Sequence, residues 1–465
     1  MAGYDFDLVC LGSGPAGQRA AVQAAKLGKR AAIVEKQHLV GGVCVGTGTI
    51  PSKTFREAVL SFAAAGALVE SGVLQPEIRP TAEQLLARVN DVIRRECLVL
   101  EDQLRRNGVA VIRGAASFVD PHTVLVQADG SLRQVSAERI LVAVGTTPGI
   151  AAASAPDGVA ITSDQIIALR RLPRAMAVVG AGIIGIEYAS MFAALGVEVT
   201  VVDRRERPLE FLDHEIVDEL VHQMRKRRVT FRFGEAVASV ASHEGPDTTA
   251  RAVLVLESGK RITTELALFS VGRQGATEAL NLHAAGLDAD ARGRLAVDGE
   301  FRTSVPHIYA AGDVIGFPAL AATSAEQGRL AACHAFGVPT HPMAAHFPVG
   351  IYAVPEISTV GAPEHELTQQ RIPYETGVAR YREIARGQIV GDDSGFFKMI
   401  FHRDDRRLLG VHIMGTGATE LIHIGQAVLA LGGGLDYFLD TVFNYPTLAE
   451  CYKVAALNAA NKLAW

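Results

Sequence analysis

Cysteine is scarce and scattered in this sequence. The chain has five cysteines in 465 residues, and no two of them have the CxxC spacing of a zinc site. An odd number at such spacings does not suggest the disulfide framework of small secreted domains. The distribution therefore predicts no metal site and favours a reducing, cytoplasmic location. The five are Cys10, Cys44, Cys97, Cys333 and Cys451.

Long apolar runs and an excess of positive charge are also lacking. No run reaches the about 18 uncharged apolar residues that a membrane-spanning helix needs. The chain opens without a basic and apolar leader. A net charge of −5 offers nucleic acid no attraction, and the basic run 225–228 is interpreted as a solvated helix face. We therefore expect no membrane and no nucleic acid among its partners.

Glycine, by contrast, is abundant, and one group of glycines has a regular setting. GSGPAG places Gly12, Gly14 and Gly17 in the G-x-G-x-x-G positions, between an apolar strand pattern at 5–11 and a helical pattern. These glycines allow a tight turn, close approach of a pyrophosphate and close helix packing. Glu35 ends the next strand pattern and can accept hydrogen bonds from both ribose hydroxyls. The unit predicts a dinucleotide site.

The same unit recurs later in the chain. A strand pattern at 175–180 leads into GAGIIG, with Gly180, Gly182 and Gly185, and the following strand pattern ends at Asp203. Two complete units at matched spacing predict an α/β fold with two Rossmann-like domains and two dinucleotides. A protein with two such sites most naturally passes electrons between them.

Several motifs occur in a fixed order that resembles one family along essentially the whole chain. They are GSGPAG, GGVCVGTGTIPSK, GAGIIGIEYAS, SVGR and HIYAAGDV. This order is similar to that of the flavin-dependent pyridine nucleotide–disulfide oxidoreductases. The resemblance implies FAD on the first unit and NAD or NADP on the second. It also implies an α+β C-terminal dimerisation domain, and therefore at least a homodimer, with a higher homo-oligomer left open.

The resemblance also divides the chain. We expect a first part of the FAD-binding domain at 1–150, with a helical segment at 53–107. An NAD(P)-binding domain at 151–275, a second FAD-binding part at 276–345 and a dimerisation domain at 346–465 follow.

Site residues follow from the same resemblance. Lys53 and Glu187 are expected to form an ion pair beside the flavin, and Asp313 is expected to bind its ribityl chain. The helix that begins near Ala321 would point its N-terminus at the flavin ring. The full set of implied cofactor contacts is Gly12, Gly14, Pro15, Gly17, Glu35, Lys36, Gly42, Val43, Cys44, Thr49, Lys53, Ala116, Gly145, Asp313, Leu320, Ala321, Gly180, Gly182, Ile183, Gly185, Glu187, Asp203, Arg204, Arg205 and Gly272.

Two departures from the family pattern indicate a subclass. Thr49 stands where disulfide-reducing members have a second cysteine, and Tyr445 stands where they have an acid–base histidine, with Glu450 in the place of its glutamate. A phenol with a pKa of about 10 is a poor proton shuttle at neutral pH. The combination, with FNYPT near the C-terminus, resembles the soluble, Si-specific pyridine nucleotide transhydrogenases. In the family, Tyr445 and Glu450 would serve the partner chain's active site.

The resemblance implies hydride transfer from NADPH to flavin N5 and on to NAD+, reversibly, in a ping-pong sequence. An NAD(P)H diaphorase or quinone reductase is one alternative, and a disulfide reductase is opposed by Thr49 and Tyr445. A nucleotide-sensing flavoprotein is a further alternative, against which Lys53, Glu187 and the two complete glycine units favour turnover. Asp203 followed by Arg204 and Arg205 suits the use of both NAD and NADP, although the arginines can also be read as a solvated loop. Cys44 either packs under the flavin ring or tunes it.

Overall fold

The first unit is built on a seven-stranded sheet in the order β3-β2-β1-β6-β5-β4, with β17 on the far side of β6. The computed structural model describes residues 3–70, 80–149, 158–244 and 250–463. The long strand β6 pairs in parallel with β1 near its end and antiparallel with β5 near its start. Its strands are β1 (Phe6–Leu11), β2 (Ala31–Glu35), β3 (Ala110–Arg113), β4 (Ala115–Asp120), β5 (Thr123–Ala128), β6 (Ser131–Val142) and β17 (Ile308–Ala310).

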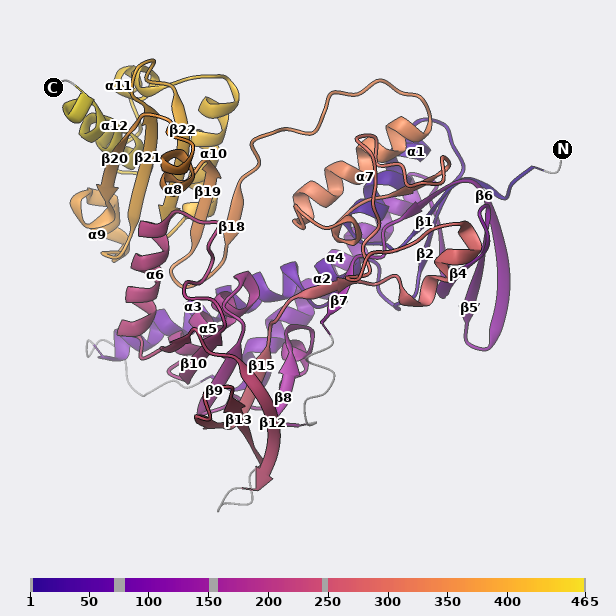
Figure 1. Ribbon diagram of the computed structural model, residues 1–465, viewed down its shortest axis with the longest axis horizontal. Coiled ribbons are helices and arrows are strands. Elements are labelled where there is room, and N and C mark those ends of the chain that lie inside the picture. The colour runs from indigo at the N-terminus through magenta and orange to yellow at the C-terminus, as the bar shows by residue number, and fades with distance from the viewer. Residues whose placement is uncertain (1–2, 71–79, 150–157, 245–249, 464–465) are drawn as a thin grey trace.

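Helices cover the parallel part of this sheet. Buried alanines line α1, and Gly328 of α7 lies so close to α1 that a Cβ there would be 2.0 Å from the carbonyl oxygen of Ala16. These small residues let the two helices pack tightly beside the sheet (Figure 1). The helices of the unit are α1 (Pro15–Lys26), α2 (Gly42–Gly46), α3 (Thr49–Glu70), α4 (Ala82–Arg106) and α7 (Ala321–Ala335).

The second unit has a five-stranded parallel sheet in the order β11-β10-β9-β15-β8 and a three-stranded antiparallel sheet β12-β13-β14. Its helix α5 carries almost only buried residues, because α3 packs on it from the first unit. The elements are β8 (Ala160–Thr162), β9 (Ala175–Val179), α5 (Ile183–Ala194), β10 (Glu198–Asp203), α6 (His214–Lys226), β11 (Thr230–Phe233), β12 (Val237–Glu244), β13 (Ala250–Leu256), β14 (Arg261–Thr264) and β15 (Leu266–Phe269).

Short elements join the two units. The two-stranded ribbon of β7 (Thr146–Pro148) and β16 (Arg273–Gly275) connects the end of the first sheet with the end of the second.

Short 3₁₀ helices occur in all three units. They are η2 (Ser163–Ala168), η3 (Glu278–Leu280), η4 (Leu282–Ala285), η5 (Asp313–Ile315) and η6 (Tyr381–Glu383).

The C-terminal unit is a five-stranded antiparallel sheet in the order β18-β19-β22-β21-β20. It lies apart from the first sheet and above the second in Figure 1, and α12 is on its outer side. Its elements are β18 (Val349–Ile351), β19 (Ile357–Gly361), α8 (Glu364–Gln369), β20 (Tyr374–Arg380), α9 (Ala385–Val390), β21 (Phe396–His402), β22 (Leu408–Met414), α10 (Ala418–Ala430), α11 (Leu435–Asp440) and α12 (Glu450–Leu463).

The predicted fold class is confirmed, since two sheets with parallel cores and covering helices precede an α+β unit. The predicted domain boundaries stay predictions, and the boundary between residues 150 and 151 lies outside the described residues. Within the described residues, no helix is both long and apolar enough to cross a membrane.

Candidate functional site

The first glycine turn has the geometry that a pyrophosphate requires. Gly12 has φ +103°, and a Cβ on it would lie 2.5 Å from the carbonyl oxygen of Ala143. A Cβ on Gly17 would lie 2.0 Å from the carbonyl oxygen of Gly12. Gly14 is different, because a Cβ there would meet no described heavy atom within 4 Å. The turn therefore keeps free space beside the N-terminus of α1, where Pro15 begins the helix and an anion is favoured.

Glu35 ends β2 and is buried beside this turn. Its Oε2 accepts from the backbone nitrogen of Ser13 at 3.0 Å and from its hydroxyl at 2.5 Å, and its Oε1 accepts from the backbone nitrogen of Gln37 at 2.8 Å. A carboxylate has about four acceptor positions. Three are used, so about one remains for a ribose hydroxyl, whereas the sequence analysis expected this carboxylate to accept from both ribose hydroxyls.

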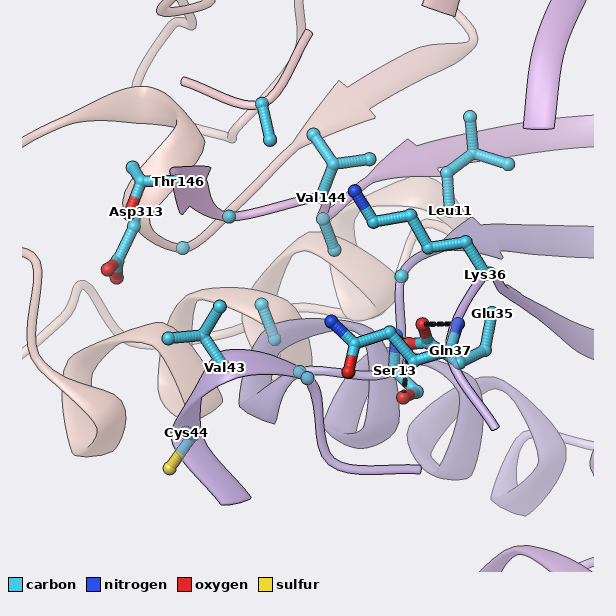
Figure 2. A pocket seen from close by; sticks show the side chains of 18 of the residues that line it. Leu11, Ser13, Glu35, Lys36, Gln37, Val43, Cys44, Val144, Thr146 and Asp313 are labelled. Atoms are coloured by element: carbon cyan, nitrogen blue, oxygen red, sulfur yellow. Dashed lines mark hydrogen bonds between the residues drawn. The ribbon is translucent and has the colours of Figure 1, made fainter. Parts of the chain in front are cut away.

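A cavity of about 450 Å³ runs from this turn to the start of α7. Figure 2 shows Glu35 and Ser13 toward one end of it and Cys44 and Asp313 toward the other. Leu320 does not line it, although its neighbours Ala319 and Ala321 do, and Gly17 packs behind the turn. The predicted residues that line the cavity are Gly12, Gly14, Pro15, Glu35, Lys36, Gly42, Val43, Cys44, Thr49, Ala116, Gly145, Asp313 and Ala321.

The far end of the cavity holds a partly buried acid, Asp313, and the start of a helix. Burial raises the pKa of Asp313, against the smaller effect of a hydrogen bond from the Ser324 hydroxyl at 3.3 Å. Leu320 is the N-cap of α7, whose first residue is Ala321 and which has no side-chain cap. Open N–H groups and the dipole at this end favour negative charge in the cavity. The cavity is long, has polar groups at both ends and begins at a glycine turn, so its residues fit FAD.

Cys44 lies in α2, with Thr49 at the start of α3. Burial raises the pKa of the Cys44 thiol, and the Thr49 hydroxyl and Lys53 oppose this only in part. All five cysteines are free. A thiol with a raised pKa stays protonated at neutral pH and is a weak nucleophile.

Lys53 and Glu187 meet where α3 packs on α5. The Lys53 Nζ lies 2.9 and 2.8 Å from the two carboxylate oxygens of Glu187. The backbone nitrogen of Tyr352 donates to the same carboxylate at 2.8 Å, and Lys53 Nζ lies 4.8 Å from the centre of the Tyr352 ring. Glu187 is 4% exposed and Lys53 26%. The predicted ion pair is present, and the C-terminal unit holds it in place.

The second glycine turn repeats the first. Gly180 has φ +103° and a Cβ on it would lie 2.5 Å from the carbonyl oxygen of Ser270, while a Cβ on Gly185 would lie 1.9 Å from that of Gly180. A Cβ on Gly182 would again meet no described heavy atom within 4 Å. Ile183 starts α5 at this turn. The open backbone and the uncapped helix fit a second dinucleotide.

Asp203 ends β10 beside this turn, and its carboxylate is fully engaged. It accepts from the backbone nitrogens of Ala181 and Arg205 at 2.5 and 2.8 Å, and from the Arg205 guanidinium at 3.0 and 2.7 Å. Burial acts to raise the pKa of Asp203, but these hydrogen bonds outweigh it and leave the pKa below its usual range. Arg204 instead pairs with Glu257 at 3.1 Å.

Three further predicted residues are not part of the two glycine turns. Gly272 adopts φ +111° next to β16 and accepts from the backbone of Gly149 at 3.0 Å. Tyr445 is 67% exposed. The Oε2 atom of Glu450, at the start of α12, is buried without a hydrogen-bond partner among the described residues. The helix α12, which begins at Glu450, lies on the outer side of the C-terminal unit (Figure 1).

Sequence reasoning missed several polar residues at the site. Ser13, inside GSGPAG, could have been found because its position faces the acid of the next strand. The Arg273 guanidinium donates to the Asp164 carboxylate at 2.8 Å and to the Thr146 hydroxyl, and so links Asp164 to the first unit. Tyr352, which contacts the Lys53–Glu187 pair, directly follows β18. These contacts join segments far apart in sequence, and no local pattern marks them.

Two dinucleotide-binding turns in one chain, with an ion pair between α3 and α5, define a two-nucleotide oxidoreductase of the α/β class. Among the described residues, no group of three or more histidine, cysteine or acidic side chains is placed to hold a metal ion.

The chain belongs to the pyridine nucleotide-disulphide oxidoreductase family. The model of that family matches residues 6–328, and the model of its dimerisation domain matches residues 347–456. Members of the family use FAD and NAD(P).

Curated relatives match over their full length. A protein of Mycobacterium tuberculosis named soluble pyridine nucleotide transhydrogenase is 53% identical, covering 99% of this chain and 98% of that one. Proteins of the same name from Colwellia psychrerythraea and Hahella chejuensis are 40% and 41% identical, covering 99% and 100% of this chain and of their own lengths.

Solved structures share the fold. LpdA from Mycobacterium tuberculosis has a TM-score of 0.88 at 28% identity, covering 97% of this chain and 98% of its own. The HOCl-induced flavoprotein disulfide reductase RclA from Escherichia coli has a TM-score of 0.86 at 25% identity, covering 97% and 99%.

Proposed function

We propose that this protein exchanges reducing equivalents between NADPH and NAD+, giving NADP+ and NADH reversibly, without a redox-active disulfide. The observation that carries the proposal is the neighbour of Cys44, which is the hydroxyl of Thr49 rather than a second thiol. Dithiol chemistry needs a thiolate and a partner sulfur, and the thiol here has a raised pKa. The full-length relatives named soluble pyridine nucleotide transhydrogenase support the same conclusion.

The first unit holds FAD in this proposal. When bound, the flavin supplies a ring that takes up and gives back two electrons. The open backbone at Gly14 and the start of α1 receive the pyrophosphate, and the free acceptor position of Glu35 receives a ribose hydroxyl. The start of α7, at Ala321, places a positive potential at the opposite end of the cavity.

The second unit binds NADPH and NAD+ in turn at the Gly180–Gly185 turn, which makes the sequence ping-pong. Asp203 serves the ribose of NAD, and Arg204 and Arg205 serve the 2′-phosphate of NADP. Lys53 and Glu187 keep a fixed charge pair between the units. Exchange between two nicotinamides needs no proton from the protein, so Tyr445 in place of a histidine is no obstacle. Tyr445 and Glu450 serve the site of a second copy in a homodimer.

Initial rates with NADPH and a thio-analogue of NAD varied together test this sequence. Because one site serves both nucleotides in turn, double-reciprocal plots should give parallel lines, with competitive inhibition by each nucleotide at high concentration. Intersecting lines would require both nucleotides on the protein together and would contradict the proposal.

A further inference from the structure

The two ribose-binding acids differ in what occupies them. Glu35 accepts three hydrogen bonds, all from Ser13 and Gln37, which leaves about one acceptor position open. Asp203 accepts four, and two of them come from the side chain of Arg205. An NAD ribose can therefore hydrogen-bond Asp203 only after this guanidinium gives up at least one position.

The same pair does not hinder NADP. A guanidinium carries five N–H donors in a rigid fork, and Asp203 uses two of them. Three remain for a 2′-phosphate while the pair with Asp203 stays formed. The Arg205 side chain is 42% exposed, against 7% for Asp203, so the guanidinium is more accessible to a ligand than the acid it holds. The conformation described is thus ready for a 2′-phosphate and closed to a 2′-hydroxyl.

We propose that Arg205 is a specificity-determining residue that competes with the ribose of NAD(H) for Asp203 and binds the 2′-phosphate of NADP(H) without leaving that acid. This rests on the proposed use of both nucleotides at the second turn. It adds that a single side chain opposes one nucleotide and recruits the other. Its removal should therefore improve the binding of NAD rather than leave it unchanged.

Arg204 is the matched control. It is the adjacent residue, of the same type and charge, but it pairs with Glu257 and not with Asp203. A general loss of positive charge would weaken both nucleotides in either variant. Only competition for Asp203 makes the two arginine variants differ in sign toward NAD.

The test is calorimetric titration of the full-length, FAD-loaded protein with ADP-ribose and with 2′-phospho-ADP-ribose, neither of which carries a nicotinamide. In Arg205→Ala, we expect ADP-ribose to bind about 3- to 10-fold tighter and the 2′-phosphorylated probe about 10-fold weaker. In Arg204→Ala, only the second probe should weaken, by a few-fold. In the double variant Asp203→Asn with Arg205→Ala, the gain for ADP-ribose should disappear.

Unchanged or weaker binding of ADP-ribose to Arg205→Ala overturns the inference. The inference is also overturned if the unmodified protein binds neither probe. If Arg205→Ala loses FAD or unfolds, Arg205→Lys serves as the test variant. Lysine keeps the positive charge but lacks the guanidinium that binds both oxygens of Asp203. Tighter ADP-ribose binding is then expected, and unchanged binding overturns the inference. The proposed function fails separately, in the rate measurements, if electrons do not pass from NADPH to an NAD analogue.

Discussion

At the residue scale, Cys44 and Thr49 separate this protein from dithiol enzymes. The thiol is half-buried, and burial is the main reason that its pKa lies above the ordinary value. A protonated thiol in a packed position is a structural side chain.

Cys44→Ser should therefore keep most of the transfer from NADPH to an NAD analogue, within about 3-fold, with FAD still bound. Steady-state rates and the visible spectrum of the purified variant check this. In the unmodified protein, alkylation of Cys44 at neutral pH should be slow, measured by mass spectrometry. Complete loss of transfer with FAD retained would place the thiol in the reaction.

The Lys53–Glu187 pair gives a second prediction at this scale. Lys53→Met leaves the Glu187 carboxylate buried with only the backbone nitrogen of Tyr352, which should cost about 2 kcal/mol or more of unfolding free energy. Thermal or denaturant unfolding measures the loss. The double variant Lys53→Met with Glu187→Leu should recover part of it, because no charge is left unpaired. A double variant less stable than the single one would contradict this reading.

At the element scale, α6 and the C-terminal sheet are joined through buried charge. Lys398 on β21 is fully buried and pairs with Asp213 at 3.1 Å, Glu215 at 2.7 Å and Glu364. His412 on β22 lies beside this group, with Nε2 3.1 Å from the carbonyl oxygen of Ala362. Because a carbonyl only accepts, Nε2 carries the proton of a neutral imidazole.

This arrangement predicts a pH dependence. Burial is the largest cause that lowers the pKa of His412, from its ordinary 6.5 to about 4, and it outweighs the opposite effect of Asp213. The unfolded chain therefore binds a proton that the folded chain excludes as pH falls from about 6.5 to about 4. Unfolding free energy should drop by roughly 3 kcal/mol over this window.

Denaturant unfolding between pH 4 and 7 checks the prediction. His412→Gln should flatten the slope, because glutamine does not titrate, whereas His283→Gln, at a residue in a highly exposed pair, should leave it unchanged. An equal slope in both variants would assign the pH dependence to other groups.

The elements themselves were largely predictable from sequence, because glycine turns and strand patterns are local. Gly12, Gly17, Gly180 and Gly185 occupy positions that a Cβ would not fit, so the pattern has a steric cause. The ring of Tyr352 beside Lys53 was not predictable, because β18 and α3 meet only through tertiary packing. Nor was the pairing of Arg205 with Asp203, since a run of acid and arginines also occurs in solvated loops.

At the scale of the whole molecule, the C-terminal unit exposes an apolar face. A hollow between α10 and α11 is lined by Ile424, Ala427 and Tyr437 together with Leu431, which is 87% exposed. Val442, just after α11, is 92% exposed. A monomeric protein rarely leaves a contiguous apolar patch, such as the hollow that Leu431 lines, in water. The match to the family's dimerisation domain assigns this unit to subunit contact.

We expect the protein to sediment as a dimer or larger at micromolar concentration. Leu431→Asp together with Val442→Asp should shift it toward monomer, since two carboxylates would have to be desolvated in the contact. Leu132→Asp, at a residue 65% exposed on β6 of the first unit, is the control. Sedimentation that is identical for the two variants would place the contact elsewhere.

A transhydrogenase and a disulfide reductase differ in the acceptor that receives the electrons of NADPH, and one assay distinguishes them. The purified full-length protein is supplied with NADPH and, in parallel, with a thio-analogue of NAD or with lipoamide. We expect rapid formation of the reduced thio-analogue and no reduction of lipoamide above background. Reduction of lipoamide, or fast quinone reduction without transfer to the thio-analogue, would contradict it.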